Sequence, residues 1–253
     1  MPARSPPGAQ LEKLPTIYDG LLSLHDSGIT ERLAKVESRI ERAAERSGRR
    51  RADIALVAVS KRFSADHLRE AYAAGLREFG ENYVQEFVDK RPQLDDLADA
   101  KYHFIGHLQS NKARLACQLF AVVQTVDSAK LLARLDAAAG ELDSKLEVML
   151  EVKLSDEESK SGALPEEVPA LLEAASRCSH LTVSGLMTMP PWNIDPEHSR
   201  PYFRQLAALA GSAGLKKISM GMSGDLEVAI EEGATIVRVG TALFGPRAKP
   251  NPA

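Results

Sequence analysis

A lysine directly follows a short apolar run early in the chain. The run is ALVAVS (residues 55–60), and Lys61 comes next without a polar spacer. Continuous apolar runs of this length are typical of strands that are covered on both faces of a parallel sheet. A lysine shielded from water at the end of such a strand can lose its proton and attack an aldehyde, forming a Schiff base. The alternative is a structural lysine whose side chain reaches out to water.

Two later segments offer the groups that bind a phosphate. SMGMSGD (residues 219–225) contains Ser223, and RVGTALFG (residues 238–245) contains Gly240 and Thr241. Small residues, hydroxyls and backbone N–H groups near the start of a helix receive an anion well. For either segment alone, the alternative is a tight turn without a ligand.

Arg238 stands inside the apolar segment TIVRVGTA. Burying an unpaired guanidinium is costly, so this side chain needs a partner. The partner is either a carboxylate in the core or a ring nitrogen of a bound heterocycle. Because side chains alternate along a strand, Arg238 and Gly240 address the same face.

Strand-like and helix-like segments alternate along the chain. The predicted strands cover residues 54–60, 76–80, 102–106, 121–125, 146–152, 182–189, 217–222 and 235–240. The predicted helices between them cover residues 64–74, 83–90, 111–119, 128–139, 165–178, 196–209 and 225–232. A further helix precedes the first strand, because Leu33, Val36 and Ile40 recur at helical spacing and Gly48 follows as a stop signal.

This alternation indicates a parallel sheet with crossover helices, either a closed (β/α)8 barrel or an open doubly wound sheet. Eight units in about 200 residues favour the barrel, and no GxGxxG motif follows the first strand. A closed barrel places strand eight beside strand one. Lys61 would then lie at the barrel mouth, within side-chain reach of the two phosphate-binding segments.

Composition and charge exclude several function classes. The 253 residues carry a formal net charge of -3, so nothing attracts the whole chain to nucleic acid or to anionic membranes. No apolar run approaches the ~20 residues that cross a bilayer, and the N-terminus lacks a signal-peptide core. Cys117 and Cys178 lack metal-ligand spacing and are expected to be buried free thiols in a reducing compartment. We therefore expect a cytoplasmic protein.

His103 and His107 have the i, i+4 spacing of zinc ligands on a helix. They fall on a predicted strand, where four residues span about 13 Å, so they cannot share a metal. One is expected to pack and the other to line the mouth. No metal site is predicted.

Seven motifs together resemble the pyridoxal phosphate homeostasis protein family, which shares its barrel with the N-terminal domain of alanine racemase. The motifs are LVAVSK, FGENYVQE, HFIGHLQSNK, EESKSG, GLMTM, SMGMSGD and VRVGTALFG. The resemblance implies one barrel of the third fold type that binds pyridoxal 5'-phosphate (PLP), over residues 29–253. Residues 1–28 form a Pro- and Gly-rich arm that is expected to be partly disordered and has no counterpart in the family.

The resemblance also implies roles for individual residues. In the family a lysine carries PLP as a Schiff base, an arginine meets the pyridine nitrogen and an asparagine lies near the ring; the matching residues are Lys61, Arg238 and Asn82. The phosphate is held by residues that match Ser223, Gly240 and Thr241. One position departs from the family pattern: Lys153 stands where asparagine is expected after the fifth strand. The polar contacts of that strand therefore do not carry over.

The expected function is to hold PLP and regulate its supply, as a carrier or buffer without racemase activity. An arginine cannot accept a proton, so the pyridine ring stays a weak electron sink. Racemases of this barrel type take a second base from a C-terminal β-domain, for which the chain leaves no room before Ala253. A monomer is expected for the same reason, with apo-PLP enzymes as recipients of the cofactor. The alternatives are a racemase-like PLP enzyme and a barrel enzyme that binds a sugar phosphate.

Overall fold

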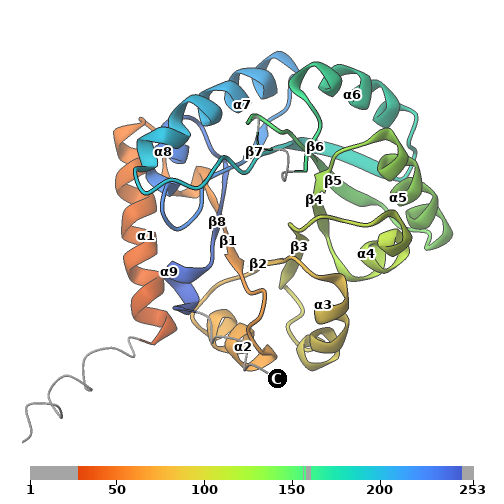
Figure 1. The fold of residues 1–253 in the computed structure, drawn as a ribbon. Coiled ribbons are helices and arrows are strands. Elements are labelled where there is room, and N and C mark those ends of the chain that lie inside the picture. Colours follow the sequence, from red (N-terminus) through yellow and green to blue (C-terminus); the bar gives the residue numbers. More distant parts are fainter. Residues whose placement is uncertain (1–27, 156, 158–160, 247–253) are drawn as a thin grey trace, which may run out of the picture.

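The computed structural model describes residues 28–155, 157 and 161–246. Within them, eight parallel strands close into a barrel in sequence order (Figure 1). The strands are β1 (Ala55–Val59), β2 (Glu78–Glu81), β3 (Lys101–Phe104), β4 (Val122–Val126), β5 (Leu146–Glu151), β6 (Leu181–Met187), β7 (Lys217–Ser219) and β8 (Ile236–Val239). Closure occurs between β1 and β8, where Ala55 pairs with Ile236 and Ala58 with Val239. The predicted closed barrel is confirmed, and each predicted strand is present.

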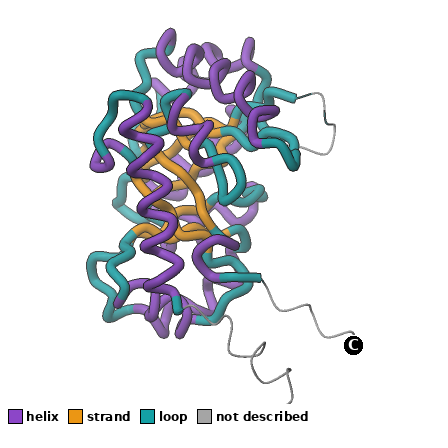
Figure 2. Tube along the Cα trace, turned by 90° about the vertical axis from the view of Figure 1, so that its left-hand side faces the viewer, coloured by secondary structure: helices purple, strands orange, loops and turns teal. Residues whose placement is uncertain are grey.

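Helices surround the strands on the outside of the barrel (Figures 1 and 2). The α-helices are α1 (Ile29–Arg46), α2 (Ala65–Ala73), α3 (Val84–Lys90), α4 (Ala113–Leu119), α5 (Ala129–Glu141), α6 (Val168–Ser176), α7 (Arg200–Ser212), α8 (Leu226–Glu231) and α9 (Thr241–Phe244). Short 3-10 helices cover Arg51–Asp53, Arg91–Leu94, Ser110–Lys112, Pro165–Glu167 and Pro196–Ser199. The predicted helix ahead of the first strand is α1, whereas α9 was not predicted.

The main hydrophobic core lies between the strands and the surrounding helices. Its largest fully buried side chains include Phe79, Phe87, Phe104 and Phe203. Helix α1 joins this core through one apolar face, formed by Val36, Ile40, Ala43 and Ala44. A small separate cluster of Val57, Val122, Met149 and Ile236 comes from the strands alone. The strands therefore bury apolar residues on both faces, as a parallel barrel requires.

Three sequence-based expectations concern the rest of the chain. The predicted arm lies outside the described residues, except for Gly28. Cys117 and Cys178 are free thiols, but both are half-buried rather than buried, and burial raises the pKa of Cys117 to about 11. Among the described residues, no helix has both the length and the apolar character of a membrane span.

Candidate functional site

A cavity of about 250 Å³ opens at the C-terminal ends of the barrel strands. Its lining includes all six site residues predicted from the sequence: Lys61, Asn82, Ser223, Arg238, Gly240 and Thr241. They come from strand β8 and from the segments that follow β1, β2, β7 and β8. Because closure of the barrel places β8 beside β1, residues from the two ends of the chain meet in one cavity.

The residues on either side of Lys61 are fixed by hydrogen bonds to carboxylates. Ser60 is fully buried, and its hydroxyl donates to Oε1 of Glu81 over 2.9 Å. Arg62 has a left-handed backbone with φ of 65°, which is uncommon for a residue other than glycine. Its backbone N–H donates to Oε1 of Glu86 over 2.6 Å. The residues on either side of Lys61 are therefore both fixed by carboxylates of the FGENYVQE motif.

Lys90 joins these two carboxylates. Its Nζ lies 2.9 Å from Oε1 of Glu81 and 2.5 Å from Oε1 of Glu86, and it donates to the Ser60 carbonyl over 3.1 Å. Burial raises the pKa of Glu81, and the charge of Lys90 opposes that shift. A buried carboxylate thus stays compatible with the fold because a buried cation accompanies it. The sequence did not single out Lys90, which stands at the end of an ordinary helix.

Asn82 brings an unsatisfied polar atom to the cavity. Its Oδ1 is buried without a hydrogen-bond partner among the described residues. The backbone at Asn82 is approached closely by Gly106, where a Cβ atom would lie 2.1 Å from the Asn82 carbonyl oxygen. A glycine is therefore required beside Asn82. The free acceptor is available to a donor on a bound ligand.

The two predicted phosphate-binding segments lie side by side. The backbone N–H of Ala242 donates to Oγ of Ser223 over 3.3 Å, which joins them. None of the described residues accepts a hydrogen bond from the backbone N–H groups of Ser223, Gly224, Gly240 or Thr241. These residues line one side of the cavity. Several unpaired backbone N–H groups at one cavity suit an anion such as a phosphate.

Arg238 is buried on the same cavity without a carboxylate partner. Its Nη1 donates to Oγ of Ser219 over 2.6 Å, and its Nη2 donates to the Thr188 carbonyl over 2.8 Å. No ion pair links it to a carboxylate among the described residues. Burial lowers the pKa of Arg238 to about 10, so it remains a cation at neutral pH. The sequence left two partners open for Arg238, a core carboxylate or a ring nitrogen of a bound heterocycle. The described residues form no such ion pair, and the guanidinium N–H groups that are not bonded to Ser219 or Thr188 are available to a ligand.

A line of hydrogen bonds continues from Arg238 through the barrel. Ser219 donates to Oε1 of Gln124 over 2.6 Å, and Nε2 of Gln124 lies 2.9 Å from Nδ1 of His103. The other ring nitrogen of His103 bonds to Glu78, which lowers the pKa of that carboxyl. We call these five residues, Glu78, His103, Gln124, Ser219 and Arg238, the interior line. The line holds the guanidinium by hydrogen bonds that lead away from the cavity.

A smaller cavity of about 160 Å³ lies next to the first, with Met189 common to both. Its lining includes His107, Glu151 and Lys153. His103 is packed in the barrel while His107 is exposed at this cavity, as predicted for this pair. The described residues contain no cluster of side chains that could hold a metal ion. Lys153, the residue that departs from the family pattern, lies at the smaller cavity and not among those lining the larger one.

The rim of the larger cavity includes residues that were not predicted. Trp192 and Asn193 come from the loop after β6, and the Trp192 side chain is 83% exposed. Trp192 is the single tryptophan of the chain. These rim residues could have been predicted from the segment MPPWN, which directly follows a strand, because the loops after barrel strands form the active or binding site.

The barrel and the lysine at its mouth define a class of protein. The family model described as "Alanine racemase, N-terminal domain" matches residues 32–248. An alanine racemase from Clostridium difficile has the same fold, with a TM-score of 0.64 at 13% identity. It covers 81% of this chain and is itself covered over 54% of its length. The class is thus the alanine racemase type of barrel.

Within that class, the chain belongs to the pyridoxal phosphate homeostasis protein family. A protein of that name from Pseudomonas aeruginosa is 47% identical over 223 residues, which cover 87% of this chain and 96% of the relative. One from Aquifex aeolicus is 42% identical, covering 86% of this chain and 97% of the relative. The structure of PipY from Synechococcus elongatus with PLP bound is 40% identical, with a TM-score of 0.76, and covers 86% of this chain and 100% of that chain. The resemblance of the motifs is confirmed.

Proposed function

We propose that this protein binds pyridoxal 5'-phosphate at the larger cavity and holds it for PLP homeostasis. The observation that carries the proposal is that a lysine, an anion cradle and an arginine without an ion-pair partner among the described residues line one cavity. The relatives named above support it, since one was solved with PLP bound. The barrel over residues 29–253 would act as one binding domain.

Each residue has a defined task in this proposal. Lys61 attaches the cofactor aldehyde, while Ser223, Gly240 and Thr241 hold the phosphate. When bound, PLP supplies an aldehyde and an electron-withdrawing ring. Arg238 donates to the pyridine nitrogen and cannot supply it with a permanent proton, since a guanidinium holds its own. Asn82 offers its free Oδ1 to a donor on the ring.

A holding role rather than catalysis is favoured by the side chains at the cavity. Apart from Lys61 and Arg238, Asp225 is the one titratable residue among the described lining residues. Its two oxygens already accept from Met222 N–H over 2.7 Å and from the Ser199 hydroxyl over 3.0 Å. A racemase needs a second free base opposite the lysine, and Asp225 is committed to these bonds. We therefore extend the proposal to a non-catalytic carrier or buffer.

The proposal includes release of PLP to apo-PLP enzymes by a cytoplasmic monomer. Large exposed apolar side chains among the described residues include Met189, Trp192 and Ile194, which share the loop after β6. This loop rims the cavity, where a recipient would have to approach. The half-buried free thiols of Cys117 and Cys178 support a reducing compartment.

Covalent trapping tests the binding proposal. Addition of PLP should give a visible absorption band, and borohydride should fix the cofactor on Lys61, as identified by peptide mass spectrometry. Lys61→Ala should lose both the band and the label. Lys153→Ala, which removes a lysine at the neighbouring cavity, should retain both. A label on any other lysine in the wild-type protein would overturn the assignment.

A further inference from the structure

Helix α1 lies along the outside of α8 and α9, the two short helices that follow the cradle segments (Figure 1). Residues 223–224 precede α8, and residue 240 precedes α9. The two helices contain six and four residues. Helices this short do not keep their shape without tertiary support. The geometry of the cradle therefore depends on what packs behind it.

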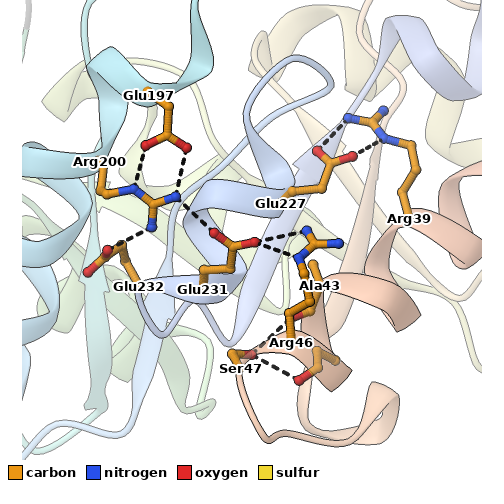
Figure 3. A network of polar contacts seen from close by, with 10 residues as sticks. Arg39, Ala43, Arg46, Ser47, Glu197, Arg200, Glu227, Glu231 and Glu232 are labelled. Carbon is orange, nitrogen blue, oxygen red and sulfur yellow. Dashed lines mark hydrogen bonds and ion pairs between the residues drawn. The ribbon is translucent and has the colours of Figure 1, made fainter.

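Arg39 of α1 reaches one cradle segment directly. Its Nη2 donates to the Ser223 carbonyl over 2.9 Å. The same guanidinium forms a two-point ion pair with Glu227 of α8, at 2.6 and 2.7 Å (Figure 3). The planar fork of arginine can satisfy these acceptors together, whereas a lysine ammonium cannot match that geometry. Arg39 thus ties the Ser223 peptide to the first turn of α8.

A second arginine of α1 supports the other segment. Nε of Arg32 donates to the Leu243 carbonyl over 2.6 Å, within α9. Other arginines nearby belong to the same surface network without contacting the cradle. We call the residues of Figure 3 that form ion pairs the outer network: Arg39, Arg46, Glu197, Arg200, Glu227, Glu231 and Glu232. Arg46, two turns after Arg39, pairs with Glu231 alone.

We propose that Arg39 is a positioning residue for the phosphate of PLP. By holding the Ser223 carbonyl from outside the barrel, it directs the adjoining N–H groups of the cradle into the cavity. Arg39 is not among the residues that line the cavity, so it acts through Ser223. This inference rests on the proposed function, and it assigns to α1 a part in cofactor binding.

Two ligands separate this role from a structural one. PLP and pyridoxal share the ring and the aldehyde, but only PLP has the phosphate. Arg39→Ala should weaken PLP binding about 5- to 10-fold, since the charge-assisted hydrogen bond that holds the Ser223 carbonyl is lost together with the ion pair to Glu227. It should leave pyridoxal binding unchanged. Quenching of the single tryptophan, Trp192 at the cavity rim, gives both dissociation constants without any assay of activity.

Arg46→Ala is the matched control, because it removes an arginine of the same helix and network that does not reach the cradle. It should bind PLP as the wild type does. Equal weakening of PLP and pyridoxal by Arg39→Ala, or unchanged PLP binding, would overturn the inference. If Arg39→Ala does not fold, Arg39→Lys provides the test, because it keeps the charge but lacks the planar guanidinium. Full PLP affinity of Arg39→Lys would also contradict the proposed role of the guanidinium. Failure of the wild type to bind PLP would instead contradict the proposed function.

Discussion

The interior line and the outer network hold polar groups in opposite surroundings. His103, Gln124 and Ser219 of the interior line are buried, and the line ends at the charged groups of Arg238 and Glu78. Every ion-pairing member of the outer network is charged, and the Arg46 side chain is half exposed. The line crosses the barrel to the candidate site, whereas the network fastens helices to one another.

This difference predicts different costs of disruption. In the middle of the interior line, Ser219 and His103 are buried and both bond to Gln124, so removal of Gln124 leaves each of them with an unpaired polar atom. In the outer network Arg200 pairs with Glu197, Glu231 and Glu232 at 2.6 to 2.9 Å. Water and alternative partners can replace any one of these contacts, and exposed pairs contribute little. Burial, rather than the number of contacts, should therefore decide the loss of stability.

The pair of Lys90 and Glu81 combines burial with charge and should give the largest effect. Lys90→Met leaves the Glu81 carboxylate buried without its cation, which should cost about 3–5 kcal/mol of unfolding free energy. Because burial raises the pKa of Glu81, the variant can protonate this carboxyl in acid, so the loss should be smaller at low pH. Urea unfolding at acidic and neutral pH measures both effects. Lys101→Met, which removes an exposed lysine 3.7 Å from Glu78, is the control.

Interruption of the interior line should cause the second-largest loss of stability. Gln124→Leu keeps the approximate size of the side chain but removes the acceptor of Ser219 and the partner of His103. Two buried polar groups are left unpaired, at about 1–3 kcal/mol each. Gln118→Leu, on the exposed face of α4, should leave the urea midpoint unchanged. Equal midpoints for the two variants would show that the line does not stabilise the barrel.

The pH dependence of stability should differ in sign between the two regions. Burial raises the pKa of Glu151, beside the interior line, from 4.5 to about 7, with Asp127 raising it further and Arg238 opposing. The folded protein then holds a proton that the unfolded chain has released, so stability falls as pH rises from 4.5 to about 7. Glu151→Gln should flatten this part of the stability curve.

Glu231 of the outer network gives the opposite sign and serves as the comparison. Hydrogen bonds from Arg200 lower the pKa of Glu231 from 4.5. Its contribution is present above that value and is lost as pH falls through the lowered pKa. Glu231→Gln should therefore reduce stability at neutral pH and have no effect in strong acid. Matching curves for the two variants would refute the distinction.

The smallest effect is expected for a single arginine of the outer network. Arg46→Ala should lower the unfolding free energy by no more than about 1 kcal/mol, and salt should reduce even this loss. Thermal unfolding in low and high salt provides the measurement. A loss as large as that of Gln124→Leu would mean that the outer network is a main support of the fold.

The barrel and its site residues were predictable because they follow from local patterns. Apolar runs alternating with helical segments fixed the strand order, and the closed barrel then placed Lys61 near Gly240 and Thr241. Each of these residues stands at a strand end, where position in the sequence determines position in the fold. The interior line was not predictable in this way, since Gln124, Ser219 and Arg238 meet only through the register of separate strands.

Other features depended on packing that no local pattern specifies. Arg39 and Ser223 are 184 residues apart in the chain, and their contact requires the docking of α1 against α8. The left-handed backbone at Arg62 accompanies the bond of its N–H to Glu86, a residue 24 positions later in the chain. The predicted helices likewise did not include Thr241–Phe244, which forms α9.

The central claim is that the site holds PLP without using it, and hydrogen exchange at the α-carbon of amino acids tests this most directly. The PLP-loaded protein is incubated with L-alanine, L-serine and L-glutamate in deuterated water, and exchange is followed by NMR. Asp225, the one acidic residue among the described lining residues of the cavity, already accepts two hydrogen bonds. Because a second base contributes typically 10²–10⁴-fold, exchange should not exceed that of free PLP. Rapid exchange that disappears in Lys61→Ala would contradict the account and identify an enzyme.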